Sequence, residues 1–155
     1  MIKVMATGVF DILHPGHIHY LNESKKLGDY LTVVVARDVT AEKNGKKLFF
    51  DENSRLKMVS YLRMVDDAVL GSKVDMFDTV IAVEPNIITL GYDQKFTQSF
   101  IEEEMERRGM NVKVVRISPY LEEKYHNSNI HLNQLNVFLS RQTFRNGRTG
   151  TETGI

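Results

Sequence analysis

The 155-residue sequence contains no cysteine, no tryptophan and only three prolines. Without cysteine the chain forms no disulfide and has no thiolate nucleophile, which suits a reducing compartment. Its 20 basic and 20 acidic side chains cancel, so no overall charge favours nucleic acid or an acidic membrane. No apolar run approaches the ~20 residues that span a bilayer, and the short N-terminal run ends at Thr7 and Gly8, unlike a signal peptide. We therefore expect a cytoplasmic protein that binds neither nucleic acid nor membrane.

Apolar runs alternate along the chain with amphipathic stretches, a pattern typical of α/β proteins. The apolar runs predict strands at residues 2–6, 31–36, 68–70, 87–90 and 112–117. The amphipathic stretches predict helices at residues 17–27, 51–64, 75–83 and 100–108. This alternation predicts a Rossmann-like, doubly wound, five-stranded parallel sheet with helices on both faces. Ligands bind such sheets beyond the carboxyl ends of the strands, where the polar residues 7–17, 37–38 and 91–93 are expected.

The segment from Gly8 to His17 carries most of the functional information, because it joins the first predicted strand to the first predicted helix. A helix N-terminus has unpaired N–H groups and a positive dipole, both of which suit an anion. Gly8 and Gly16 let backbone approach a ligand without an intervening Cβ. His14 and His17 add imidazole donors at the same place, so we predict a phosphate site with these two as catalytic residues. The alternative is a pair of surface loop histidines.

Residues 7–28 resemble the signature of the cytidylyltransferase-like nucleotidyltransferases, whose mark is His-x-Gly-His after a first strand. Within that superfamily the chain most resembles the archaeal FAD synthases over about residues 2–120. The likeness rests on Gly8–Asp11, His14–His17, Ala36–Asp38 and Gly91–Gln94. It implies transfer of the adenylyl group of ATP to FMN with release of pyrophosphate, Mg²⁺ bound with the triphosphate, and a homodimer. No metal site made by the protein alone is expected.

The expected ATP contacts combine the histidine motif with residues near the later strands. They are Val9, Phe10, His14, Pro15, Gly16, His17, Asp93 and Tyr120. Val9 and Phe10 would offer backbone N–H groups, although Phe10 is also a candidate core residue. Asp93 follows an apolar strand and could accept from a ribose hydroxyl or a base amino group, and the resemblance places ATP contacts at Asp93 and Tyr120.

Four further residues are expected to support the site: Thr7, Gly8, Asp11 and Asp38. Asp11 could orient a histidine or hold its own turn, and Asp38 could face a metal or a ribose. For the acceptor phosphate we choose Lys46, from a polar loop that also carries Lys43 and Lys47, and Arg55, which has a counterpart in the family. A solvated loop is the alternative for the lysines.

His19 extends the motif to His-x-x-His-x-His, which invites a zinc interpretation. Residues two apart on a helix point away from each other, and no cysteine or nearby carboxylate completes a tetrahedral ligand set. We therefore expect His19 to be a packing or capping residue.

The composition changes near the end of the chain, so we predict a nucleotidyltransferase domain at residues 1–125 and an atypical segment at 126–155. Relatives of this kind carry a Ser/Thr-rich stretch there, and the segment would form one helix near Leu132–Leu139 before a disordered end. An altered segment suggests an incomplete triphosphate site. The alternatives to FMN adenylylation are a cytidylyltransferase for glycerol-3-phosphate or a similar small phosphate, and a nucleotide-binding module without turnover.

Overall fold

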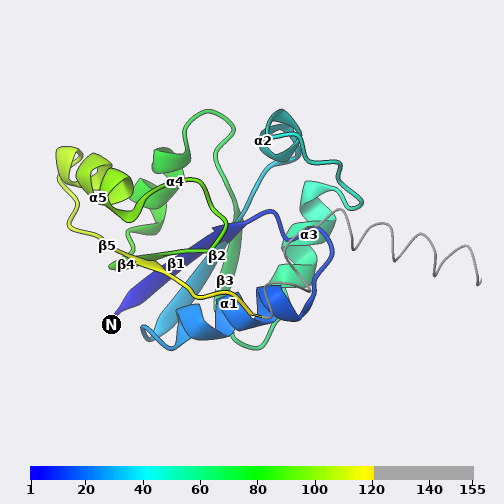
Figure 1. The fold of residues 1–155 in the computed structure, drawn as a ribbon, viewed down its shortest axis with the longest axis horizontal. Helices are drawn as coiled ribbons and strands as arrows, with labels where there is room; N and C mark the ends of the chain where they lie inside the picture. The colour runs from blue at the N-terminus through cyan, green and yellow to red at the C-terminus, as the bar shows by residue number, and fades with distance from the viewer. Residues whose placement is uncertain (121–155) are drawn as a thin grey trace, which may run out of the picture. The chain divides into compact units, whose positions relative to one another are not determined.

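A computed structural model describes residues 1–120, which form an all-parallel, five-stranded sheet with flanking helices (Figure 1). The strands are β1 (Lys3–Gly8), β2 (Tyr30–Val35), β3 (Asp67–Leu70), β4 (Ile87–Leu90) and β5 (Lys113–Arg116). The helices are α1 (Pro15–Lys25), α2 (Asp38–Lys43), α3 (Glu52–Ser60), α4 (Met76–Val83) and α5 (Gln98–Arg107). The strand order is β3-β2-β1-β4-β5, which confirms the predicted doubly wound fold.

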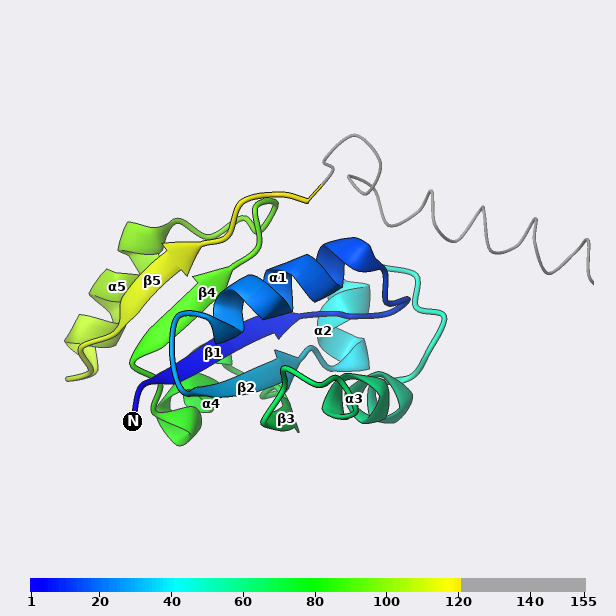
Figure 2. The same ribbon diagram turned by 90° about the horizontal axis from the view of Figure 1, so that it is seen from below.

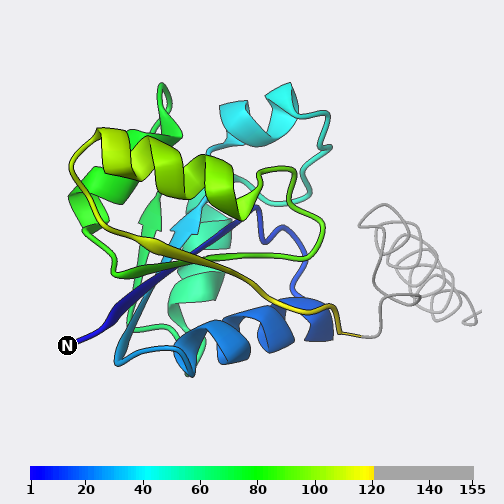
Figure 3. The same ribbon diagram turned by 60° about the vertical axis from the view of Figure 1, so that its left-hand side comes forward.

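The central strands are mostly apolar because helices cover both faces of the sheet, and Thr32 and Thr89 among them are buried. On one face α1 and α3 pack on β1 and β2 through residues that include Leu21, Val59, Val4 and Leu31. On the other face α4 and α5 pack against residues of β4 and β5, among them Ile88 and Val114. Figures 1 and 3 show α5 and α1 on opposite sides of the sheet.

Every strand and helix predicted within residues 1–120 is present, β4 at its predicted bounds and the others with shifted ends, and one helix of this region was not predicted. The helix predicted near Leu132–Leu139 lies outside the described residues. The helix that was not predicted is α2, in which only Ala41 is buried. A short polar helix has no apolar stripe and gives no periodic signal in the sequence.

The connections place a topological switch point between β1 and β4. From the central β1 the chain moves outward through β2 to β3, and then returns to β4 on the other side of β1. The segments that follow β1 and β4 therefore leave the sheet in different directions at the same edge. This is where open α/β sheets bind ligands.

Two sequence predictions concern residues that the structure does not describe. The boundary at residue 125 and the atypical segment 126–155 lie outside the described residues. Within residues 1–120, no helix has the length and apolar character needed to cross a membrane.

Candidate active site

His14 and His17 lie together at the N-terminus of α1, where they cap the helix. His14 is the N-cap residue, and its Nδ1 accepts a hydrogen bond from the N–H of Gly16 at 3.0 Å. In return, Nδ1 of His17 accepts from the N–H of His14 at 3.3 Å. The two rings stack with 3.8 Å between their centroids. The two histidines thus form one unit that is held by the backbone of the helix start.

These capping bonds decide which ring nitrogen carries the proton. A nitrogen that accepts from a backbone N–H has no proton of its own, so the neutral form of both rings is the Nε2–H tautomer. Pro15 is the first residue of α1 and leaves no backbone N–H unsatisfied. The positive end of the helix dipole lies at the same point. This arrangement suits a phosphate group, because imidazole donors and the dipole act on the same region.

Phe10 is a core residue that shapes the turn before the histidines. Its φ of 52° lies in the left-handed region, where a side chain is uncommon. Its ring is 3% exposed and meets the His17 ring edge-on, with 5.4 Å between centroids. A Cβ on Gly8 would come within 2.8 Å of two carbons of the Phe10 ring. Gly8 therefore makes room for the ring of Phe10, and the prediction that its backbone approaches a ligand stays a prediction.

Asp11 has a role that differs from both interpretations of the sequence. Its Oδ2 accepts from the N–H of Phe49 and its Oδ1 from the N–H of Phe50, each at 2.8 Å. Asp11 thereby ties the loop before α3 to the loop that carries the histidines. Figure 2 shows the two loops side by side at the same end of the sheet.

Arg55 is fully buried, with an exposed fraction of 0%. Its Nη1 donates to the carbonyls of Val9 at 2.7 Å and Ala36 at 2.8 Å. Its Nε donates to the carbonyl of Phe50 at 3.1 Å, and its Nη2 donates to Oδ1 of Asp38 at 2.7 Å. The prediction that Arg55 reaches the acceptor phosphate is wrong, because its buried guanidinium bonds to three backbone carbonyls and to Asp38. Asp38, expected at a metal or a ribose, is the carboxylate partner of Arg55.

The loop after β4 is tied to the end of β1. Nε2 of Gln94 donates to the carbonyl of Thr7 at 2.9 Å, across the switch point. Arg116, at the end of β5, supports this loop by donating from Nη1 to the carbonyls of Gly91 at 2.8 Å and Gln94 at 3.1 Å. Asp93 is exposed on the same loop. Sequence reasoning missed Arg116, and the signal that was available is a basic residue at the carboxyl end of a predicted strand.

A buried tyrosine joins β1 and β4 beneath this site. The hydroxyl of Tyr20, on α1, donates to the carbonyl of Thr89 at 2.8 Å and accepts from the N–H of Thr7 at 3.2 Å. Burial raises the pKa of Tyr20 to about 12, although its hydrogen bonds with Thr89 and Thr7 lower it. Tyr20 therefore keeps its proton, and the strand ends on both sides of the switch point stay linked.

Tyr120 and His19 connect the segment after β5 to α1. Their rings stack with 5.4 Å between centroids, and Nε2 of His19 donates to the carbonyl of Ser118 at 3.1 Å. This confirms His19 as a packing residue. Within residues 1–120, no group of three or more His, Asp or Glu side chains is placed to hold a metal ion.

Lys43, predicted in a basic loop, is the last residue of α2, and the loop with Lys46 and Lys47 follows it and reaches the histidine loop. Lys43, Lys46 and Lys47 are exposed, and Gly45 has the positive φ of 80° that the turn requires. The N–H of Lys46 donates to the carbonyl of Ala41 at 3.0 Å. This loop begins at α2, which follows β2, and Asp11 holds its far end at Phe49. The lysines therefore lie on the β2 side of the histidine motif.

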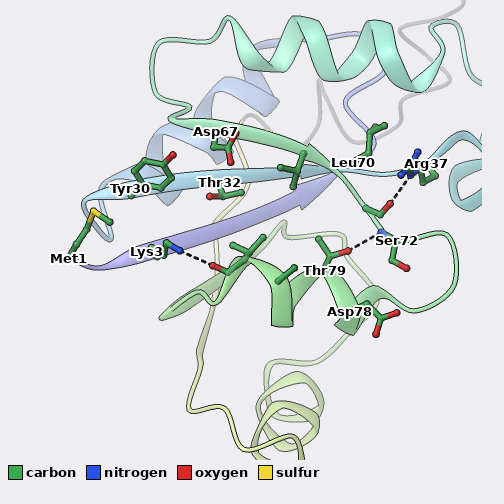
Figure 4. Close-up of a pocket in the computed structure, with 14 residues that line it drawn as sticks. Met1, Lys3, Tyr30, Thr32, Arg37, Asp67, Leu70, Ser72, Asp78 and Thr79 are labelled. Atoms are coloured by element: carbon green, nitrogen blue, oxygen red, sulfur yellow. Dashed lines mark hydrogen bonds between the residues drawn. The ribbon is translucent and has the colours of Figure 1, made fainter.

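A cavity of about 510 Å³ lies elsewhere, along β2 and β3 beside α4 (Figure 4). Its lining includes Lys3, Thr32, Asp67 and Thr79, and neither His14 nor His17. Of the residues expected at the ligand-binding edge of the sheet, it includes Arg37. Three side-chain hydrogen bonds join residues of its lining. They run from Lys3 Nζ to the carbonyl of Val83, from the N–H of Ser72 to Oγ1 of Thr79, and from Nε of Arg37 to the carbonyl of Gly71. This cavity is therefore separate from the histidine site.

Known proteins similar to this chain belong to the superfamily that the histidine motif indicated. A family model described as cytidylyltransferase-like matches residues 5–148. An FAD synthase from Thermoplasma volcanium is 64% identical over 120 residues, which cover 77% of this chain and 84% of that protein. An FAD synthase from Picrophilus torridus is 63% identical over 119 residues, covering 77% of this chain and 86% of that protein.

A solved structure from Thermoplasma volcanium is also similar in sequence and fold. It is described as a lipopolysaccharide core biosynthesis protein, with 64% identity and a TM-score of 0.77. The match covers 77% of this chain and 98% of that one. This solved structure and the FAD synthase of Thermoplasma volcanium have the same identity to this chain.

Proposed function

Because this chain belongs to the cytidylyltransferase-like family, we propose that it is an FAD synthase that adenylylates FMN with ATP. The relatives named FAD synthase, at 63–64% identity, support the choice of nucleotide and acceptor. The single observation that carries the chemistry is the histidine cap of α1. It brings two imidazoles to the carboxyl end of β1, next to β4, where this fold binds ligands.

The reaction is a phosphoryl-type displacement at the α-phosphorus of ATP. An oxygen of the FMN phosphate forms a bond to this phosphorus. The bond between the α-phosphorus and the oxygen that bridges it to the β-phosphorus breaks, and pyrophosphate leaves with the electron pair of that bond. The nucleophile is already an anion, so no strong general base is required. His14 and His17 donate to the phosphate oxygens and stabilise the charge that develops there, and the positive end of α1 adds to this effect.

The two substrates approach the histidines from opposite sides. We assign ATP to the β4 and β5 side, where Asp93 is exposed on the loop that Gln94 and Arg116 hold. Tyr120 belongs to the same side. The acceptor phosphate is assigned to the β2 side, with Lys46 as its cationic contact. Arg55 has no part in this assignment because it is buried.

Two further properties belong to this proposal. We expect ATP to act as its Mg²⁺ complex, with the ion held by phosphate oxygens and water; a chelator should stop turnover and added Mg²⁺ should restore it. We also expect a homodimer, as the likeness to archaeal FAD synthases suggests. Light scattering on the pure protein gives its mass and tests this directly.

A substrate panel tests the proposed activity. The pure protein is incubated with ATP or CTP, each with FMN or glycerol-3-phosphate, and pyrophosphate and the nucleotide product are quantified. FAD from ATP and FMN alone supports the proposal. Product from CTP and glycerol-3-phosphate instead would identify a cytidylyltransferase. Tight ATP binding without pyrophosphate in any mixture would identify a binding module.

A further inference from the structure

Phe49 is an exposed aromatic residue whose backbone is fixed in place. Its side chain is 47% exposed, yet its N–H donates to Asp11 at 2.8 Å and the next N–H, of Phe50, donates to the same carboxylate. The carbonyl of Phe50 accepts from buried Arg55. The Phe49 and Phe50 rings meet edge-on with 4.8 Å between centroids. The ring of Phe49 is therefore presented outward by a braced segment.

The brace joins Phe49 to the catalytic loop. Asp11 lies three residues before His14 in the sequence, so the carboxylate that holds Phe49 belongs to the loop that carries the histidines. Lys46 and Lys47 lie on the same segment, three and two residues before Phe49, respectively. A chain of three residues spans at most about 11 Å. Cationic groups and an exposed aromatic face thus lie within reach of a single small molecule.

This combination matches the chemistry of the acceptor in the proposed function. FMN is an anionic phosphate joined by a short ribityl chain to a large planar aromatic ring. Such a ring binds favourably by stacking on an aromatic side chain, and the phosphate binds to cationic groups.

The other exposed phenylalanines of this edge already stack on neighbours. Phe96 and Phe100 stack on each other with 5.8 Å between centroids and 11° between planes. They lie on the β4 and β5 side, which the proposed function assigns to ATP. Phe49 lies on the β2 side together with the basic loop.

We propose that Phe49 is the stacking surface for the isoalloxazine ring of FMN, with Lys46 and Lys47 directed to the FMN phosphate. The inference rests on the proposed function for the identity of the acceptor. It assigns the acceptor subsite to the loop between α2 and α3, and it makes Asp11 a positioning residue that holds this subsite against the histidine loop.

Flavin binding to variants of Phe49 tests this assignment. FMN fluorescence is titrated with Phe49→Ala, Phe49→Trp and the full-length parent protein, in the presence of an ATP analogue with a carbon bridge between the α- and β-phosphorus. Loss of stacking in Phe49→Ala should raise the Kd for FMN roughly 5- to 100-fold, and Phe49→Trp should restore binding. The Kd for the ATP analogue should stay within about twofold, because the nucleotide lies on the other side.

Phe96→Ala is the matched control, since Phe96 is 42% exposed at the same edge of the sheet. It should leave the Kd for FMN unchanged. An unchanged Kd in Phe49→Ala, or a larger rise in Phe96→Ala, would overturn the assignment. If the parent protein binds FMN through Phe49 but forms no FAD, the proposed activity fails while the flavin subsite stands. If the parent does not bind FMN, the subsite is refuted as well.

Discussion

Arg55 has a buried guanidinium with four hydrogen bonds, so we expect stability to depend strongly on it. Replacing it by methionine leaves the Asp38 carboxylate and three backbone carbonyls without their donor. The Asp38 side chain is 33% exposed and can be hydrated, but each buried carbonyl left without a donor costs about 1–3 kcal/mol. We therefore expect Arg55→Met to lower the free energy of unfolding by about 3 kcal/mol or more in urea denaturation. Exposed Arg63, replaced in the same way, should change it by less than about 0.5 kcal/mol. A stable Arg55→Met variant with weakened acceptor binding would return Arg55 to the phosphate site.

Single residues also show where sequence reasoning succeeds. His14, Gly16 and His17 interact with one another within four positions, so their geometry follows from the local strand-to-helix pattern. Arg55 bonds to Val9, 46 positions away, and Asp11 to Phe49, 38 positions away. No local pattern specifies such partners. Arg55 and Asp11 were therefore predicted to support the ligand site, although their hydrogen bonds are to distant parts of the chain.

At the scale of elements, the turn from β1 to α1 depends on Gly8. Gly8→Ala would place a methyl group within 2.8 Å of the Phe10 ring. Overpacking of this kind costs about 1–3 kcal/mol, and moving the ring would also disturb its contact with His17. We expect lower stability in thermal unfolding and lower activity.

Gly71→Ala is the control for this element, because the nearest atom to its added Cβ lies at 3.4 Å. It should be tolerated better than Gly8→Ala. A smaller side chain at position 10, in the double variant Gly8→Ala with Phe10→Leu, should recover part of the loss. Equal effects of the two glycine substitutions would show that the Phe10 ring does not set this turn.

The elements themselves were largely predictable because their signals are local. Continuous apolar runs gave the strands, and glycine and proline gave several helix ends. Helix α2 was missed because it presents only Ala41 to the core. The hydrogen bond from Gln94 to Thr7 was also beyond prediction, since it depends on which strands are neighbours in the sheet.

For the whole molecule, acid should reduce stability through carboxylates that are bonded in the folded state. Burial raises the pKa of Asp66, but hydrogen bonds from Lys25 and the N–H of Leu31, with the Lys25 charge, lower it more, so the net pKa lies below 3.8. The hydrogen bond from Arg37, followed by that from the N–H of Asp38, lowers the pKa of Glu52 below 4.5.

Groups with a lowered folded-state pKa stabilise the protein above their unfolded pKa, and this contribution disappears as pH falls through the folded value. We expect the free energy of unfolding to be level near neutral pH and to fall below about pH 5. Urea denaturation from pH 7 to pH 3 measures this. Asp66→Asn should reduce the fall in the free energy of unfolding between pH 5 and pH 3. An unchanged fall would show that protonation of Asp66 is not linked to folding.

The most direct test of the central claim, that the histidine cap of α1 performs adenylyl transfer, is single-turnover formation of FAD by the pure protein and by His17→Ala. Loss of one such donor should slow the chemical step about 10²–10³-fold. Stability should fall by about 1–2 kcal/mol, because His17 accepts one bond from His14 and its ring contacts those of His14 and Phe10. A decrease of less than about tenfold in a folded, ATP-bound variant would contradict the claim and remove His17 from the reacting site.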